Sequence, residues 1–230
     1  WSASMTAEDR HRLERLRQGD AEGWSAVESR GPRSLDDRAW TRFLAGDLPD
    51  YPELILQANY REVRRRLDAV LGDDQDLTTM DVHHWQQVNP VITEALVQLT
   101  TGGPQTVYWG GLAQGRVRYF DPRSRRPGLP PDVAALVRRL DGDSVELTLV
   151  NLSVSATREV ILGAGSFGEH RFTSAAIDGA SDGPDAAIDD GYLQVCLPPG
   201  TEVDLRLGME RNCSRPSYAF PWHADGIPFR

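Results

Sequence analysis

The segment from Asp73 to Asn89 has the densest set of residue types that can do chemistry. It contains four aspartates, two adjacent histidines and a tryptophan, and long irregular segments inside compact domains are often functional. Asp81 can form an acid–base or orienting pair with either His83 or His84, because a carboxylate beside an imidazole can direct proton transfer. We therefore predict His84, Asp81 and His83 as catalytic residues. The alternative is a solvated turn in which one histidine ring is packed.

Other catalytic chemistries find little support in the sequence. The aspartates and histidines can ligate a divalent metal, but their spacing matches no specific metal motif. The glycine-rich run 163–168 lies between two predicted strands, so it is neither a nucleophile elbow nor a dinucleotide fingerprint. All 25 basic residues are arginine, which excludes Schiff-base chemistry and a P-loop lysine. We expect no metal and no cofactor.

Aromatic residues follow the two histidines and recur after the next predicted helix. Trp85 precedes two glutamines, of which Gln86 is the first. A flat apolar ring can pack on the C–H face of a sugar while amides form hydrogen bonds. Tyr108 and Trp109 precede two glycines, which allow close approach of a ligand. We predict Trp85, Gln86, Tyr108 and Trp109 as substrate-binding residues on the same concave surface as the catalytic candidates, although Trp109 can equally be a core residue.

Two further polar groups have simpler interpretations. Residues 123–126 carry three arginines that can clamp a carboxylate or phosphate, but surface pairing with Asp121 or Asp132 is favoured. His170 follows Glu169 on a predicted strand. Alternation along a strand sends one side chain inward and the other outward, so these two are not expected to act together.

Helical periodicity dominates the first 100 residues. Capping patterns and apolar spacing predict four helices, over about 6–19, 34–46, 50–72 and 89–101. Asp50 caps the third helix, with Pro52 in its first turn, and Asn89 is expected to cap the fourth. Apolar residues recur along the third helix at Leu56, Tyr60, Val63, Leu67, Val70 and Leu71. Its other side carries Arg61, Arg64, Arg65 and Arg66.

After Gly103 the apolar period changes from 3.6 to 2. About seven short strands are expected, at 106–109, 116–120, 145–151, 158–162, 170–175, 192–197 and 203–207. One short helix is predicted over 132–140. The fold class is therefore α+β. We predict a helical region over 1–103, forming the end of a helical array or α/α toroid, an antiparallel β-sandwich over 104–209, and a tail over 210–230.

The tail and the cysteines complete the structural expectations. Residues 210–230 carry five large apolar side chains among three prolines, so we expect the tail to be ordered and largely buried, either on its own domain or on a further domain or partner subunit. Two cysteines are too few for a disulfide framework. Cys196 is predicted to be a buried strand thiol. A single bridge to Cys213 is the alternative.

Composition restricts the partners. The net charge of −9 argues against nucleic-acid or anionic-membrane partners. No run of 18 apolar residues occurs, and the first 20 residues are too charged for a secretory signal, so we expect a cytoplasmic protein. The chain begins at Trp1 rather than methionine, and it is therefore expected to be a fragment, a processed subunit or an extended form of a chain starting at Met5.

The order of these features resembles a known architecture. Amphipathic helices, an Asp/His/Trp segment, a helix near Asn89-Pro90 and strands containing Leu147–Ser153 together resemble the C-terminal portion of bacterial helical-toroid proteins that carry a β-sandwich. Such proteins are commonly glycoside hydrolases or polysaccharide lyases. The resemblance implies part or a subunit of a carbohydrate-active enzyme acting on an oligo- or polysaccharide. No catalytic motif of either family can be matched residue by residue, and the alternative is a non-catalytic interaction module or accessory subunit.

Overall fold

The computed structural model describes residues 6–19, 38–84, 88–103, 114–177 and 186–223. The chain divides into two compact units. The helical unit is built mainly from residues 7–96, and the sheet unit mainly from residues 97–104 and 112–230. The expected α+β class is confirmed, with most of the β-structure in the C-terminal part. No helix in the described ranges is both long enough and apolar enough to cross a membrane.

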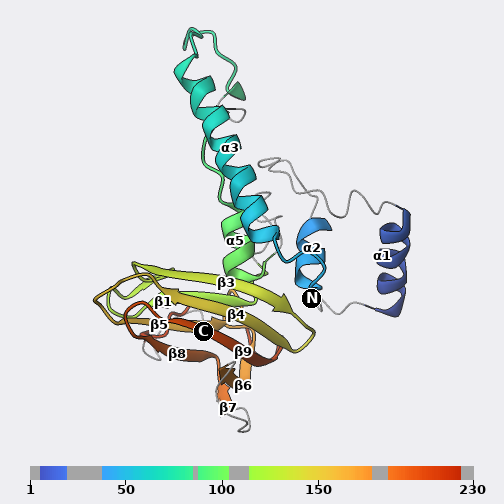
Figure 1. Cartoon of the computed structure of the whole chain (residues 1–230), viewed down its shortest axis with the longest axis vertical. Helices are drawn as coiled ribbons and strands as arrows, with labels where there is room; N and C mark the ends of the chain where they lie inside the picture. Colours follow the sequence, from blue (N-terminus) through green and yellow to red (C-terminus); the bar gives the residue numbers. More distant parts are fainter. Residues whose placement is uncertain (1–5, 20–37, 85–87, 104–113, 178–185, 224–230) are drawn as a thin grey trace. The chain divides into compact units, whose positions relative to one another are not determined.

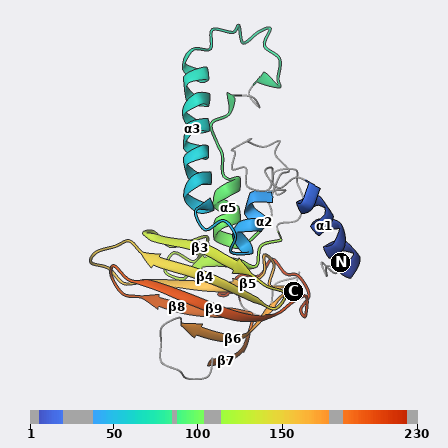
Figure 2. The same ribbon diagram turned by 45° about the vertical axis from the view of Figure 1, so that its right-hand side comes forward.

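Among the described residues, the helices are α1 (Ala7–Gly19), α2 (Arg38–Leu44), α3 (Tyr51–Leu71) and α5 (Glu94–Thr101). Of these, α1, α2 and α3 belong to the helical unit, and α5 spans the boundary between the two units in the sequence (Figures 1 and 2). Trp40, Phe43 and Tyr51 join α2 to the start of α3, with ring centroids 5.5 to 5.8 Å apart. Each of the four predicted helices has a counterpart in the structure. The last one, α5, begins at Glu94 rather than at Asn89.

The apolar stripe of α3 is not one buried face. None of the predicted stripe residues is buried: Tyr60 is 73% exposed and Leu71 is 84% exposed. The buried apolar residues of the helix, such as Ile55 and Ala58, lie outside the stripe. Helical spacing identifies which side chains share a face, but it does not say whether anything covers that face along its whole length. The C-terminal half of α3 therefore presents apolar side chains without cover from the described residues.

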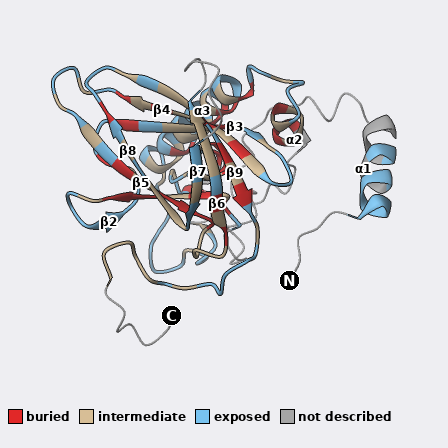
Figure 3. Ribbon diagram, turned by 90° about the horizontal axis from the view of Figure 1, so that it is seen from below, coloured by how far each residue is buried: buried red, intermediate tan, exposed pale blue. Residues whose placement is uncertain are grey.

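In the described part of the chain, nine antiparallel strands form two sheets. They are β1 (Val117–Asp121), β2 (Arg126–Pro127), β3 (Val133–Leu140), β4 (Ser144–Asn151), β5 (Arg158–Ala164), β6 (Arg171–Ile177), β7 (Ala186–Asp190), β8 (Tyr192–Leu197) and β9 (Glu202–Glu210). One sheet has the order β2-β1-β5-β8 and the other β3-β4-β9-β6-β7. Buried residues from both sheets make one core (Figure 3), and along β4 every second residue is buried while the others are partly exposed. The predicted strands within the described ranges are confirmed.

The short helix predicted over 132–140 is wrong, because this segment is strand β3. Val133 and Val137 are buried, and a spacing of four places two residues on one face of a strand as well as of a helix. A register shift after Val137 then brings Leu140 opposite Val145, where it packs against the core. Pairing along the whole of β4 outweighs the helix propensity of the alanines, leucine and arginines in this segment.

Residues 211–223 of the tail fold back on the sheet unit. The N–H of Ser217 donates to the Phe167 carbonyl over 2.7 Å. The rings of Phe220 and Trp222 both lie 5.8 Å from that of Phe120. Tyr218 is 73% exposed and none of residues 211–223 is buried, so the prediction of a largely buried tail is wrong for the described residues. Residues 224–230 lie outside the described ranges.

Both predictions for the cysteines are wrong. Cys196 and Cys213 are free and exposed. Leu197 points into the core, and alternation along β8 therefore turns its neighbour Cys196 to the outer face. An apolar run alone does not show which of its alternate positions face inward.

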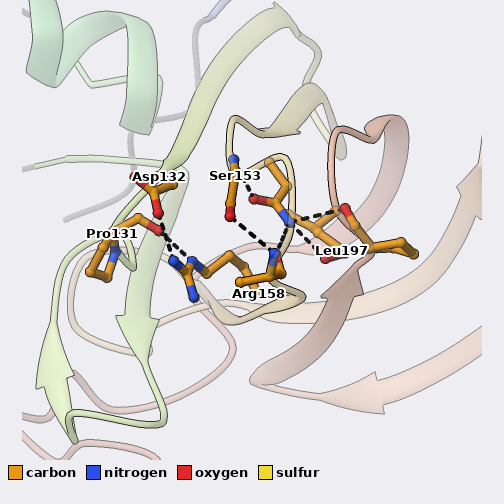
Figure 4. A network of polar contacts seen from close by, with 8 residues as sticks. Pro131, Asp132, Ser153, Arg158 and Leu197 are labelled. Carbon is orange, nitrogen blue, oxygen red and sulfur yellow. Dashed lines mark hydrogen bonds and ion pairs between the residues drawn. The ribbon is translucent and has the colours of Figure 1, made fainter.

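One buried amide ties the two sheets together (Figure 4). Asn151 is 1% exposed, and its Nδ2 donates to the carbonyls of Ala156, Leu197 and Pro198 over 2.8 to 3.0 Å. Its Oδ1 accepts the N–H of Ser153. Asn151 ends β4 in one sheet, and Leu197 ends β8 in the other, so one side chain satisfies backbone groups of both.

Asn151→Ala is expected to lower the free energy of unfolding by about 2–4 kcal/mol. The loss combines several hydrogen bonds at about 1 kcal/mol each with buried carbonyls left without donors. Denaturation in guanidinium chloride measures the change. Gln194→Ala, at an exposed position of β8, is the matched control and should change stability by no more than about 0.5 kcal/mol. Equal effects of the two substitutions would contradict the role of Asn151.

Candidate functional site

The segment that follows α3 contains a close carboxylate–imidazole pair. Asp73 Oδ2 lies 2.5 Å from His84 Nε2, and the two side chains are 15% and 17% exposed. Nearly every side chain between them, from 74 to 83, is exposed. The hydrogen bond with His84, reinforced by the N–H of Gln75, lowers the pKa of Asp73. Asp73 is therefore ionised at neutral pH and holds the imidazole in one orientation.

A second pair forms at the surface. Asp81 Oδ1 accepts the N–H of His83 and lies 2.8 Å from the ring Nδ1 of the same residue. These side chains are 75% and 65% exposed. Of the two partners left open for Asp81, the structure pairs it with His83, and His84 contacts Asp73 instead. An aspartate readily bonds the residue two positions on within its own turn, whereas Asp73 reaches His84 only because the chain folds back over eleven residues.

A buried arginine anchors the returning chain to α3. Arg66 is 4% exposed. Its Nε lies 2.7 Å from Glu62 Oε1, and its Nη1 donates to the Asn89 carbonyl over 2.6 Å. Hydrogen bonds and positive charge from Arg65 and then Arg66 lower the pKa of Glu62 to about 2. Arg66 therefore departs from the expected solvent-facing side of the helix, and it fixes the chain five residues after His84.

The remaining predicted residues are only partly placed. Asn89 does not cap α5, because its Oδ1 accepts the N–H of Val91 before the helix begins at Glu94. Trp85, Gln86, Tyr108 and Trp109 lie outside the described residues. The shared concave surface proposed for them and His84 therefore stays a prediction. Among the residues that the structure describes, no group of three or more histidine, cysteine, aspartate or glutamate side chains is arranged to hold a metal ion.

A second polar cluster lies in the sheet unit, around Glu169 and His170, which were not expected to act together. Glu169 Oε1 is 3.9 Å from His170 Nε2, so these neighbours do face one another. The prediction that these two side chains point to opposite faces of a strand is wrong, because Glu169 precedes β6 and lies in the turn after β5 rather than on a strand. Arg116 and Arg211 lie close to this turn in the backbone: the Arg116 carbonyl accepts the N–H of Gly165, and the N–H of Asn212, next to Arg211, donates to His170 Nδ1. No local motif marks the two arginines, which are 95 positions apart in the sequence.

The arginine loop after β1 is confirmed as a surface structure. Asp121 Oδ1 accepts the N–H groups of Arg123 and Ser124, and its Oδ2 lies 3.6 Å from Arg126 Nε. Asp132 pairs instead with Arg158, over 2.6 Å. The carboxylates of this region are therefore used to shape a turn and to brace β5.

Comparison with known proteins gives one match. Residues 1–97 match the family described as Domain of unknown function (DUF8034). The matched range includes α3 and the segment with Asp73 and His84, and it ends before the first strand. No curated protein and no solved structure matches the chain.

Proposed function

We propose that this chain is part or a subunit of a carbohydrate-active enzyme of the glycoside hydrolase or polysaccharide lyase type. Asp73 and His84 are its proton-transferring pair. The observation that carries the proposal is the 2.5 Å contact between Asp73 Oδ2 and His84 Nε2. It is partly shielded from water in a segment whose other side chains are mostly exposed.

The pair has the arrangement that general acid–base catalysis needs. A carboxylate bonded to one ring nitrogen fixes the imidazole orientation and stabilises the imidazolium that forms when the ring accepts a proton. In a lyase, His84 would take the proton from the carbon atom that bears the carboxylate of a uronic sugar. In a hydrolase, it would activate a water molecule. Asp81 and His83, fully at the surface, are assigned no step.

The substrate class is supported by sequence and architecture. Trp85 follows His84 directly in the chain, and an aromatic ring beside a proton-transfer group suits a pyranose. We further propose that the two antiparallel sheets, which share one core, form the β-sandwich of a helical-toroid enzyme, and that α1, α2, α3 and α5 belong to the end of its helical array. The partner is then an oligo- or polysaccharide.

The second candidate is an interaction module, which a separate observation favours. The helical unit exposes large apolar side chains along α3 and the segment after it, at Tyr60, Leu67, Leu71, Leu77 and Val82. Apolar patches of this kind commonly mark contacts with another domain or subunit.

The test is a screen for glycan cleavage by the chain, alone and within any longer protein that contains it. Neutral and uronic-acid polysaccharides are incubated with the protein, and new reducing ends and unsaturated products are measured. We expect cleavage of at least one polysaccharide, with loss of activity in His84→Ala. Tight binding to another protein with no cleavage in any format would favour the interaction module instead.

A further inference from the structure

Three basic residues, Arg116, His170 and Arg211, lie at one end of the sheet unit. Arg116 precedes β1, and its carbonyl accepts the N–H of Gly165 over 2.9 Å. His170 precedes β6, and Arg211 follows β9. Arg171 pairs with Glu210 in the ladder, and the next step of that register places His170 opposite Arg211. The turn over 165–170 passes from β5 in one sheet to β6 in the other, and so it brings the three residues together.

The two arginines are not neutralised within the described chain. Arg116 Nη1 and Arg211 Nε are buried and have no hydrogen-bond partner. Burial, followed by repulsion from Arg211, lowers the pKa of Arg116 to about 10. The guanidinium of the neighbouring Arg171 differs from those of Arg116 and Arg211, because it forms ion pairs with both Asp189 and Glu210. Arg171 Nε and Arg138 Nε also lack a hydrogen-bond partner, but both of these guanidinium groups pair with carboxylates.

The nearest carboxylate is already engaged. Glu169 accepts the N–H groups of Ser166 and Phe167, over 3.3 and 2.7 Å. A Cβ atom at Gly165, where φ is +89°, would lie 2.6 Å from this carboxylate, so glycine is needed for the turn to close on it. The carboxylate nearest to His170, at 3.9 Å, is therefore already used to shape the turn.

His170 is set up as a hydrogen-bond donor toward the cluster. The N–H of Asn212 donates to His170 Nδ1 over 3.1 Å, so the ring proton of the neutral histidine is on Nε2. Burial is the main cause that lowers the pKa of His170, and Glu169 opposes the shift, while Arg116 and Arg211 add to it. Arg118, which is close to Glu169, is engaged by the Ser166 carbonyl at 3.0 Å.

Buried guanidinium groups without a counter-charge are costly, and the cost is removed when an anion binds between them. Arginine also presents the fork geometry that matches oxyanions, in two parallel N–H···O bonds. We propose that Arg116, Arg211 and His170 form a binding site for an oxyanion group of a ligand. A carboxylate of an acidic sugar and a phosphate or sulfate ester share this chemistry. The site does not depend on the Asp73–His84 pair.

The test is titration of the chain with inorganic phosphate, sulfate and glucuronate, against chloride at equal ionic strength. Calorimetry gives the affinity, and the ring nitrogen signals of His170 report occupancy by NMR. We expect saturable binding of at least one anion, with a rise in the pKa of His170. Arg116→Gln and Arg211→Gln should each weaken it about 10- to 100-fold, the usual loss for a hydrogen bond to a charged group. Comparing the three anions distinguishes a carboxylate ligand from a phosphate or sulfate ligand.

Arg215→Gln is the matched control. It removes the same charge from an exposed position in the same tail, and it should change the affinity less than about twofold, the size of a screened surface effect. If a variant does not fold, the ring nitrogen signals of His170 in the unmodified chain still show whether an anion binds at this site. The proposal is overturned if none of the anions binds saturably, if His170 does not respond, or if Arg215→Gln weakens binding as much as the cluster variants.

Discussion

His84→Ala is expected to lower kcat about 10²- to 10⁴-fold on the glycan that the enzyme cleaves, the usual range for loss of a general acid–base group. Asp73→Asn should cost a similar factor, because an amide no longer stabilises the imidazolium at the 2.5 Å contact. The double variant should be little worse than either single one, since residues that act as a unit lose their effect together. Turnover on the purified glycan measures all three.

His83→Ala and Asp81→Asn are the matched controls for this pair. They carry the same chemical changes a few residues away, at side chains that are 65% and 75% exposed. We expect them to leave kcat within about twofold of the parent value, since neither group is shielded enough to control a proton. If these variants lose activity while Asp73→Asn does not, the pair has been assigned wrongly. Unfolding curves for all four variants separate loss of chemistry from loss of structure.

Phe172→Ala should destabilise the sheet unit by about 3–5 kcal/mol, the usual cost of removing a buried aromatic side chain. Phe172 lies on β6 and is 0% exposed, within a core that takes residues from both sheets. Leu162 lies on β5 in the other sheet and is equally buried. Leu162→Ala should therefore weaken the same transition, by about 2–5 kcal/mol. Guanidinium denaturation measures both changes.

Val154→Ala is the control for these core variants. Val154 is 91% exposed, and its truncation should change stability by no more than about 0.5 kcal/mol. The two sheets would not share one cooperative core if Phe172→Ala and Leu162→Ala shifted separate transitions. A loss below about 1 kcal/mol for Phe172→Ala would contradict its burial.

Local sequence patterns were sufficient for most of the secondary structure. The span of α3 follows from Pro52, the apolar spacing and Gly72, because these act within a turn or two of helix. Asp50 stands at the N-cap position, but the prediction that it caps the helix is wrong, because its side chain forms no capping hydrogen bond. The alternation along β4 likewise predicts that Val145, Leu147 and Leu149 face inward. The segment 132–140 was misassigned because a spacing of four satisfies both periods, and only pairing with β4 separates a strand from a helix there.

The sequence by itself determined the α+β order, the main helices and strands, and the segment in which carboxylates and imidazoles are concentrated. The tertiary structure decided which of them meet. Asp73 rather than Asp81 contacts His84. The buried Arg66 donates a hydrogen bond to the Asn89 carbonyl, and the charges of Arg116 and Arg211 act on His170. Such pairings join residues far apart in the chain, and no local spacing encodes them, because chain reversals and strand register set which side chains become neighbours.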